Sequence, residues 1–270
     1  MKKVYVLLLA VMLTCLGCQW QFSSSDDFSE NGVSVERYDR IQSLYLNTGD
    51  FSALQQMNTH YPQQTRTLIE DVLKIGRVNE PEINVKFLNF YQDTTLQTLI
   101  ASVEHEFASM DDVDRDLDAA FSRLEEMLPG IAVPFIYAQI GALDQSIIVG
   151  DSLLGISLDK YLGSSYPLYL RQDYGYTDSQ RSMMTRDYIV PDCIGFYLLS
   201  LYPMPSAPQT TQLDRDMHIG KVQWVVNQAM NRTVFNTLYV RSVGHYMKSH
   251  PGVTVDSLLR DNTNLKLIGR

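Results

Sequence analysis

Apolar residues recur at helical spacing along most of the chain, separated by short polar stretches. The clearest amphipathic patterns cover residues 95–110 and 112–128, where one apolar stripe faces one side and charged residues face the other. Pro129 and Gly130 end the second pattern. The same reasoning predicts further helices at residues 34–47, 51–59, 65–75, 191–202, 213–230 and 234–250. The chain is therefore predicted to be mainly helical.

Strand character is concentrated between these helices, in residues 131–163. β-Branched and aromatic residues fill positions 131–140, Gly141 interrupts them, and the pattern resumes at 146–149 before a turn at Gly150 and Asp151. Apolar runs bounded by glycine and aspartate are typical of neighbouring antiparallel strands. We predict an α+β fold with a small antiparallel sheet at about residues 131–160, packed against helices.

The first residues have the features of a targeting segment. Lys2 and Lys3 precede ten apolar residues, which are too few to span a bilayer, and Gly17-Cys18 follows. This pattern is typical of a lipoprotein signal peptide at 1–17 with Cys18 as the acylated residue, although an ordinary secretory peptide is the alternative. Acyl chains on Cys18 would anchor the protein, at about 0.8 kcal/mol per buried methylene. Residues 18–33 are then a flexible polar tether, and 34–270 a single domain.

Charge and cysteine content narrow the classes of partner. The 270 residues carry a formal net charge of −9, and removing residues 1–17 leaves 20 basic and 31 acidic residues, a charge of −11. Nucleic acids and anionic lipid surfaces require basic patches, so neither is an expected partner. The mature chain retains Cys18 and Cys193, so no disulfide framework is expected. Cys193 lies in an apolar helix and is predicted to be a buried small hydrophobe.

Motifs for metal or nucleophilic catalysis are incomplete. His105-Glu106 begins like the zinc motif HExxH, but Ser109 stands where the second histidine would be. The chain contains no GxSxG or Walker pattern, and the mature part from Cys18 on contains no CxxC pattern. We therefore expect no metal ion and no cofactor.

Several carboxylates stand beside apolar stretches, where a charge costs several kcal/mol unless it is paired. Asp151, Asp159 and Asp192 are these residues, and Tyr161 and Tyr188 could complete a polar cluster with them. Capping and turn roles are the simpler interpretation. A hydrolase in which Asp159 and Asp192 act as an acid/base pair is an alternative function, and it requires both carboxylates in one cleft.

Tyrosine is abundant, with 16 residues in the chain. A lipoprotein that binds glycans or peptides is a third hypothesis, because aromatic side chains form contact platforms for such ligands. That hypothesis predicts an exposed platform, while an ordinary tyrosine-rich loop is the alternative. The residues concerned are Tyr166, Tyr169, Tyr174 and Tyr176.

Six short segments together resemble the GldB family of gliding-motility lipoproteins from Bacteroidota. They occur in the family's order, and the fourth is the most specific; the resemblance weakens after about residue 231. The segments are VERYDR at 35–40, FYQD at 90–93, PFIY at 134–137, LGISLDKYLG at 154–163, YIVPD at 188–192 and Gly220-Lys221.

The resemblance implies a lipid-anchored envelope protein, held at the inner or outer membrane with its domain in the periplasm or at the cell surface. Its expected partners are the membrane and other envelope proteins of a secretion or motility assembly. The family also resembles zinc-dependent peptidases at a distance, which implies a zincin-like fold. Pro191 and Gly195 would then take the places of the two zinc-binding histidines, and Asp192 that of the general-base glutamate. The expected protein is thus non-catalytic, a pseudoenzyme without its metal motif.

Overall fold

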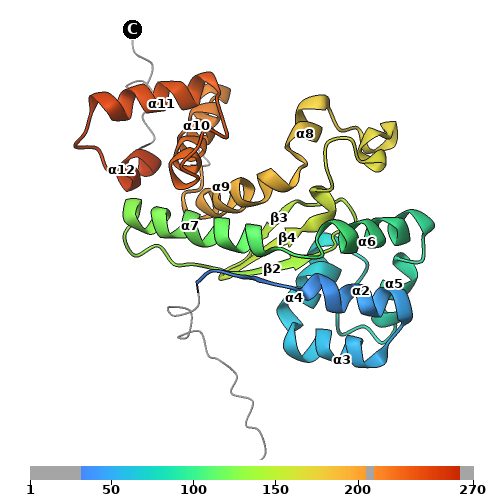
Figure 1. Cartoon of the computed structure of the whole chain (residues 1–270). Coiled ribbons are helices and arrows are strands. Elements are labelled where there is room, and N and C mark those ends of the chain that lie inside the picture. The colour runs from blue at the N-terminus through green and yellow to red at the C-terminus, as the bar shows by residue number, and fades with distance from the viewer. Residues whose placement is uncertain (1–31, 205–209, 262–270) are drawn as a thin grey trace, which may run out of the picture. The chain divides into compact units, whose positions relative to one another are not determined.

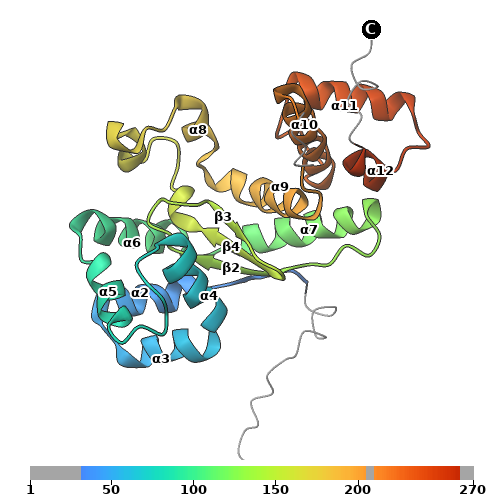
Figure 2. The ribbon, with the colours of Figure 1, turned by 180° about the vertical axis from the view of Figure 1, so that it is seen from behind.

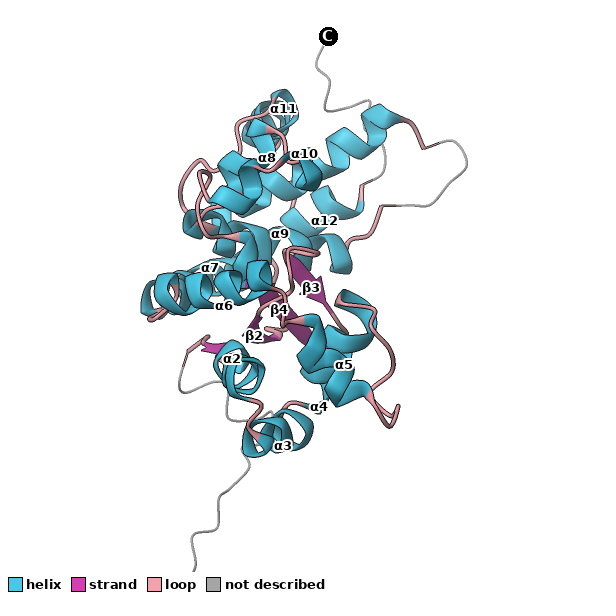
Figure 3. Cartoon of the chain, turned by 90° about the vertical axis from the view of Figure 1, so that its right-hand side faces the viewer, coloured by secondary structure: helices cyan, strands magenta, loops and turns pink. Residues whose placement is uncertain are grey.

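A small mixed sheet lies between two groups of helices in the computed structural model, which describes residues 32–204 and 210–261 (Figure 1). All of the elements below belong to one unit, Val33–Arg270. Helix α2 packs on β2 at one side of the sheet, and α9 packs on β3 and β4 at the other (Figure 3). The mainly helical α+β class predicted from the sequence is confirmed.

The sheet contains both parallel and antiparallel pairs, so the prediction of an antiparallel sheet was wrong in part. Its strands stand in the order β1-β2-β4-β3; β2 runs parallel to β1 and β4, and only β3 and β4 are antiparallel. After β2, residues 140–146 cross the end of β4 and lead to β3 at the edge of the sheet. The turn at 150–152 then leads into β4, which lies between β2 and β3. The strands are β1 Val35–Glu36, β2 Phe135–Gln139, β3 Ile147–Val149 and β4 Leu153–Ser157.

Helices before β2 form most of the N-terminal half of the unit. Asp50 caps α3 and Asp93 caps α6, since each carboxylate accepts two backbone N–H groups of the first turn. A π-helical turn, Thr67–Val72, follows α4 directly. The helices are α2 Tyr38–Thr48, α3 Phe51–His60, α4 Pro62–Arg66, α5 Ile83–Phe90, α6 Thr94–Glu106 and α7 Asp111–Met127.

The C-terminal half consists of helices, and short 3₁₀ turns lie between β4 and α9. Helix α9 contacts α7 and α10, and α10 in turn packs on α11 and α12 (Figures 1 and 2). None of the helices in the described residues is both long enough and apolar enough to span a bilayer. The helices are α8 Asp178–Met183, α9 Ile189–Leu201, α10 Gln212–Ala229, α11 Leu238–Ser249 and α12 Val255–Arg260, and the 3₁₀ turns are Leu158–Lys160, Pro167–Leu170, Gln172–Tyr174 and Arg186–Tyr188.

Buried tyrosines fill much of the core beside the sheet. Tyr38 and Tyr137 are both almost fully buried, and their rings meet edge to face at 6.2 Å between centroids. The ring of Tyr137 crosses Gly155 of β4 so closely that a Cβ atom there would lie 2.6 Å from the Tyr137 hydroxyl. Only glycine fits at this point, which explains one residue of the LGISLDKYLG segment.

Candidate functional site

The structure brings two of the five predicted cluster residues together. Tyr161 donates its hydroxyl hydrogen to Oδ2 of Asp192 at 2.8 Å. Asp151 is exposed in the turn between β3 and β4, and Tyr188 packs its ring against Phe235 with 6.2 Å between centroids. Asp159 is fully buried and bonded elsewhere. Of the five predicted residues, the structure thus joins only Tyr161 and Asp192 by a hydrogen bond.

Asp159 holds a loop in the core. Its Oδ1 accepts the backbone N–H of Gly141 at 2.6 Å, and its Oδ2 accepts that of Leu143 at 2.5 Å. The loop needs this support because Ala142 and Leu143 both have positive φ, at 52° and 65°. Burial raises the pKa of Asp159, and the two backbone hydrogen bonds partly oppose that shift.

The hydrolase hypothesis requires Asp159 and Asp192 in one cleft, and of the two only Asp192 lines the pocket. Asp192 lines a pocket, whereas the Asp159 side chain has no exposed surface and both of its oxygens bond to backbone amides. A carboxylate in that setting is not placed to exchange a proton with a ligand in the pocket. This geometry does not support the acid/base pair, and the hydrolase alternative stays a prediction.

The pocket beside Asp192 lies between α8, α9 and α10 and has a volume of about 430 Å³. Lys160, Tyr161 and Asp192 contribute polar groups to its lining. Three of its apolar side chains are exposed to solvent: Met183 at 37%, and Phe196 and Ile219 at 42% each. Pockets with apolar walls and a few convergent polar groups are typical of ligand sites.

Asp192 carries an uncompensated charge in this pocket. Among the ion pairs of the described residues, none includes Asp192. Burial raises its pKa from 3.8 to about 6, and the hydrogen bond from Tyr161 lowers it by a smaller amount. Burial also raises the pKa of Tyr161 well above its ordinary value, so the phenol stays protonated and acts as the donor. A shifted carboxyl in a pocket is a recognised marker of function.

Replacing Asp192 by asparagine should stabilise the protein at neutral pH. A raised pKa means that the folded protein binds the proton of Asp192 more tightly than the unfolded chain does. Protonated Asp192 therefore stabilises the fold below about pH 4, and this contribution is lost as the pH rises through about 6. We expect Asp192→Asn to raise the melting temperature at pH 7 by roughly 4–8 °C, the equivalent of about 2 kcal/mol. Thermal unfolding at pH 4 and pH 7 measures this, with the difference disappearing at pH 4. An equal difference at both pH values would contradict it.

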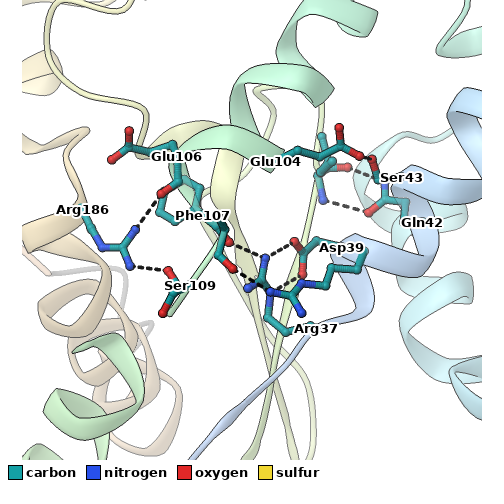
Figure 4. Close-up of polar contacts among 12 residues, drawn as sticks. Arg37, Asp39, Gln42, Ser43, Glu104, Glu106, Phe107, Ser109 and Arg186 are labelled. Atoms are coloured by element: carbon teal, nitrogen blue, oxygen red, sulfur yellow. Dashed lines mark hydrogen bonds and ion pairs between the residues drawn. The ribbon is translucent and has the colours of Figure 1, made fainter. Parts of the chain in front are cut away.

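The VERYDR segment clamps the corner between α6 and α7 (Figure 4). Arg37 makes a two-pronged ion pair with Asp39, at 2.8 and 2.7 Å, and also donates to the Phe107 carbonyl at 2.7 Å. Arg40 donates to the Ala108 carbonyl at 2.7 Å. Both carbonyls lie just past the last residue of α6, so these guanidinium groups supply partners to the backbone where the helix stops.

Arg186, in the 3₁₀ turn before α9, bonds to the same corner between α6 and α7 (Figure 4). It donates to the carbonyls of Glu106 and Ser109, at 3.0 and 2.7 Å, and its guanidinium lies 5.1 Å from the centre of the Phe107 ring. Two further bonds, at 2.8 and 2.6 Å, join it to the Asp112 carboxylate. Distant segments thus meet at one corner, and their charged groups serve the fold.

The four tyrosines of residues 166–176 do not form an exposed platform. Tyr169 is fully buried, and its ring packs against those of Tyr166 and Tyr176 at 5.1 and 6.0 Å between centroids. Tyr174 stacks on Tyr176 at 6.2 Å, and these partly buried rings cover a small apolar cluster. The prediction of a glycan- or peptide-binding platform here was wrong, because the rings pack against one another.

The zinc-peptidase likeness places Pro191, Asp192 and Gly195 where a metal motif would be. All three lie on α9 and line the pocket described above. Within the described ranges, no three histidine, cysteine, aspartate or glutamate residues are grouped as a metal site. The zincin-like fold stays a prediction, and Cys18, the predicted acylation site, lies outside the described residues.

Comparisons with known proteins agree with the resemblance seen in the short segments. The family model described as gliding motility protein GldB matches residues 21–239. Searches among curated proteins and among solved structures gave no match. The match covers more than half of the chain and includes all six segments, the Arg37 clamp and the pocket on α9. The chain therefore belongs to the GldB family of gliding motility lipoproteins.

Proposed function

We propose that this chain is a non-catalytic protein of the cell envelope, anchored by lipid at Cys18 and acting through contacts with other proteins of a secretion or motility assembly. Membership of the GldB family over residues 21–239 is the observation that carries the proposal. The Gly17-Cys18 sequence after a short apolar stem supplies the anchor.

Three of the family segments use polar side chains to hold the fold together, which supports a non-catalytic role. Arg37 and Asp39 hold the α6–α7 corner, and Asp159 holds the loop at 141–143. Tyr91 of the FYQD segment is fully buried and donates to the Ile140 carbonyl at 2.6 Å. Polar groups that are fully bonded inside the fold are not free to act on a substrate.

Lipid anchoring is tested by replacing the acylated residue. In Cys18→Ser the acyl chains have no attachment point, so we expect the protein to lose palmitate labelling and to leave the detergent-rich phase in phase partition. Cys15→Ser is the matched control, since it alters a neighbouring cysteine and should leave labelling unchanged. Equal labelling of wild type and Cys18→Ser would refute the anchor.

The absence of catalysis and the role of contacts need separate measurements. Purified protein should contain no stoichiometric zinc, and chelator treatment should change neither its stability nor any hydrolytic activity. Crosslinking in intact cells, followed by purification of the lipidated protein, should recover the same envelope proteins repeatedly. Stoichiometric zinc that a chelator removes together with an activity would overturn the proposal.

A further inference from the structure

The pocket between α8, α9 and α10 contains one carboxylate without an ion-pair partner in the described part of the chain, beside apolar walls. Oδ2 of Asp192 accepts the Tyr161 hydroxyl hydrogen, while Oδ1 has no hydrogen bond within the described residues. Met183, Phe196 and Ile219 are exposed at 37%, 42% and 42% in the same pocket. A ligand that satisfies both features carries a positive charge together with a bulky apolar group.

The spacing along α9 restricts how far apart those two ligand groups can be. Asp192 and Phe196 are four residues apart in one helix, so their Cβ atoms are roughly 5–6 Å apart on one face. An α-ammonium and an apolar side chain diverge from the same carbon atom, which matches this separation. In a lysine side chain, four methylenes separate the ammonium from the backbone. A neighbouring apolar side chain would then lie too far from the charge to match the spacing of Asp192 and Phe196.

Lys160 supplies a donor to the same pocket. Its ammonium bonds to the Leu143 carbonyl at 3.2 Å and to the Tyr176 hydroxyl at 2.9 Å, and it lies 4.6 Å from the centre of the Tyr176 ring. An ammonium has three hydrogens, so a third is available to an acceptor. The carbonyl next to an α-ammonium in a peptide is such an acceptor.

Gly195 keeps part of the pocket open. It lies inside α9, where glycine destabilises a helix relative to alanine. A Cβ atom at this position would meet only Cγ2 of Val226, at 3.7 Å, which is an ordinary contact. Packing therefore does not require a glycine, and the space in front of it remains available to a ligand.

We propose that this pocket binds the free amino terminus of a peptide whose first residue is large and apolar. The α-ammonium pairs with Asp192, and the first peptide carbonyl accepts from Lys160. The apolar side chain lies among Met183, Phe196 and Ile219. This proposal goes beyond the anchored envelope role, because the contacts that it names do not involve Cys18.

Calorimetric titration of the full mature chain in detergent tests the proposal. The probe is a tripeptide amide with phenylalanine, leucine and alanine in that order, either with a free amino terminus or N-acetylated. We expect the free form to bind and the acetylated form to bind at least about tenfold more weakly, because acetylation removes the charge. A third probe, an acetylated peptide that contains lysine, should bind as weakly as the acetylated tripeptide.

Two variants separate binding from folding. Asp192→Asn should weaken the free peptide about tenfold while leaving the acetylated peptide unchanged. Gly195→Leu should abolish binding of both while the melting temperature is retained, with Gly195→Ala as the smaller step. Equal affinity for the free and acetylated peptides, no heat from the free peptide at millimolar concentration, or tightest binding of the lysine peptide would each overturn the assignment. None of these results would alter the phase partition of Cys18→Ser, so the two proposals fail separately.

Discussion

Asp159→Ala should be among the most destabilising single substitutions in this protein, lowering the free energy of unfolding by about 4 kcal/mol. The variant removes both acceptors of the Gly141 and Leu143 N–H groups and leaves two buried donors without partners. It also releases a loop in which Ala142 and Leu143 are held at positive φ. Thermal or urea unfolding measures the change, which corresponds to roughly 8–16 °C in melting temperature.

Asp151→Ala is the matched control for this prediction. It removes the same side chain from an exposed turn of the same sheet, so the expected change is within about 0.5 kcal/mol. Asp159→Asn should fall between the two, since the amide oxygen accepts one N–H while the amide nitrogen faces the other. If Asp159→Ala were no more destabilising than Asp151→Ala, the loop would not depend on this carboxylate.

Helices with a clear amphipathic stripe were predictable, and short elements were not. The pattern at 95–110 and 112–128 corresponds to α6 and α7, because their apolar faces are buried and their opposite faces are solvated. Helix α5 was missed: Ile83 and Phe87 are buried, but Val85 and Phe90 are exposed and obscure the stripe. Strand β1, two residues long, fell within a predicted helix.

Strand direction was not predictable, since a buried apolar run serves a parallel or an antiparallel pair equally well. The candidate site was predictable only in part. The sequence marks Asp159, Tyr161 and Asp192 as polar groups beside apolar stretches, and all three are at least partly buried. The sequence does not show which partner each residue takes. In the structure, Asp159 in the 3₁₀ turn Leu158–Lys160 bonds to the loop at 141–143, and Tyr161 bonds to Asp192.

The pocket itself was missed, and one signal in the sequence pointed to it. Gly195 interrupts an otherwise apolar helix without a turn, a cap or a close backbone contact to explain it. The Arg37 clamp was visible only as part of a family segment. The distant partner of Arg37 is the Phe107 carbonyl, 70 residues later, and a carbonyl carries no residue-type signal.

Arg37→Ala should lower the free energy of unfolding by about 3 kcal/mol, or roughly 6–12 °C in melting temperature. Arg37 and Asp39 are 17% and 4% exposed, so the substitution leaves a buried carboxylate without its cation and the Phe107 carbonyl without its donor. Arg37→Lys should recover only part of the loss, because an ammonium cannot bond to both carboxylate oxygens and the carbonyl in the same geometry.

A double-mutant cycle and a comparison with an exposed ion pair test whether burial of the Arg37–Asp39 pair causes the predicted loss of stability. In the cycle, Asp39→Asn should reduce the cost of Arg37→Ala, since the neutral amide no longer needs the cation; a coupling of at least about 1 kcal/mol is expected. Arg115→Ala is the control, because Arg115 and Asp116 lie 3.7 Å apart with 72% and 55% of their side chains exposed, where ion pairs contribute within about 0.5 kcal/mol. Additive changes in the cycle, or an equal loss at Arg115, would show that the α6–α7 corner does not depend on the buried pair. A coupled loss confined to Arg37 would show that the VERYDR segment acts by joining the first helix of the unit to that corner.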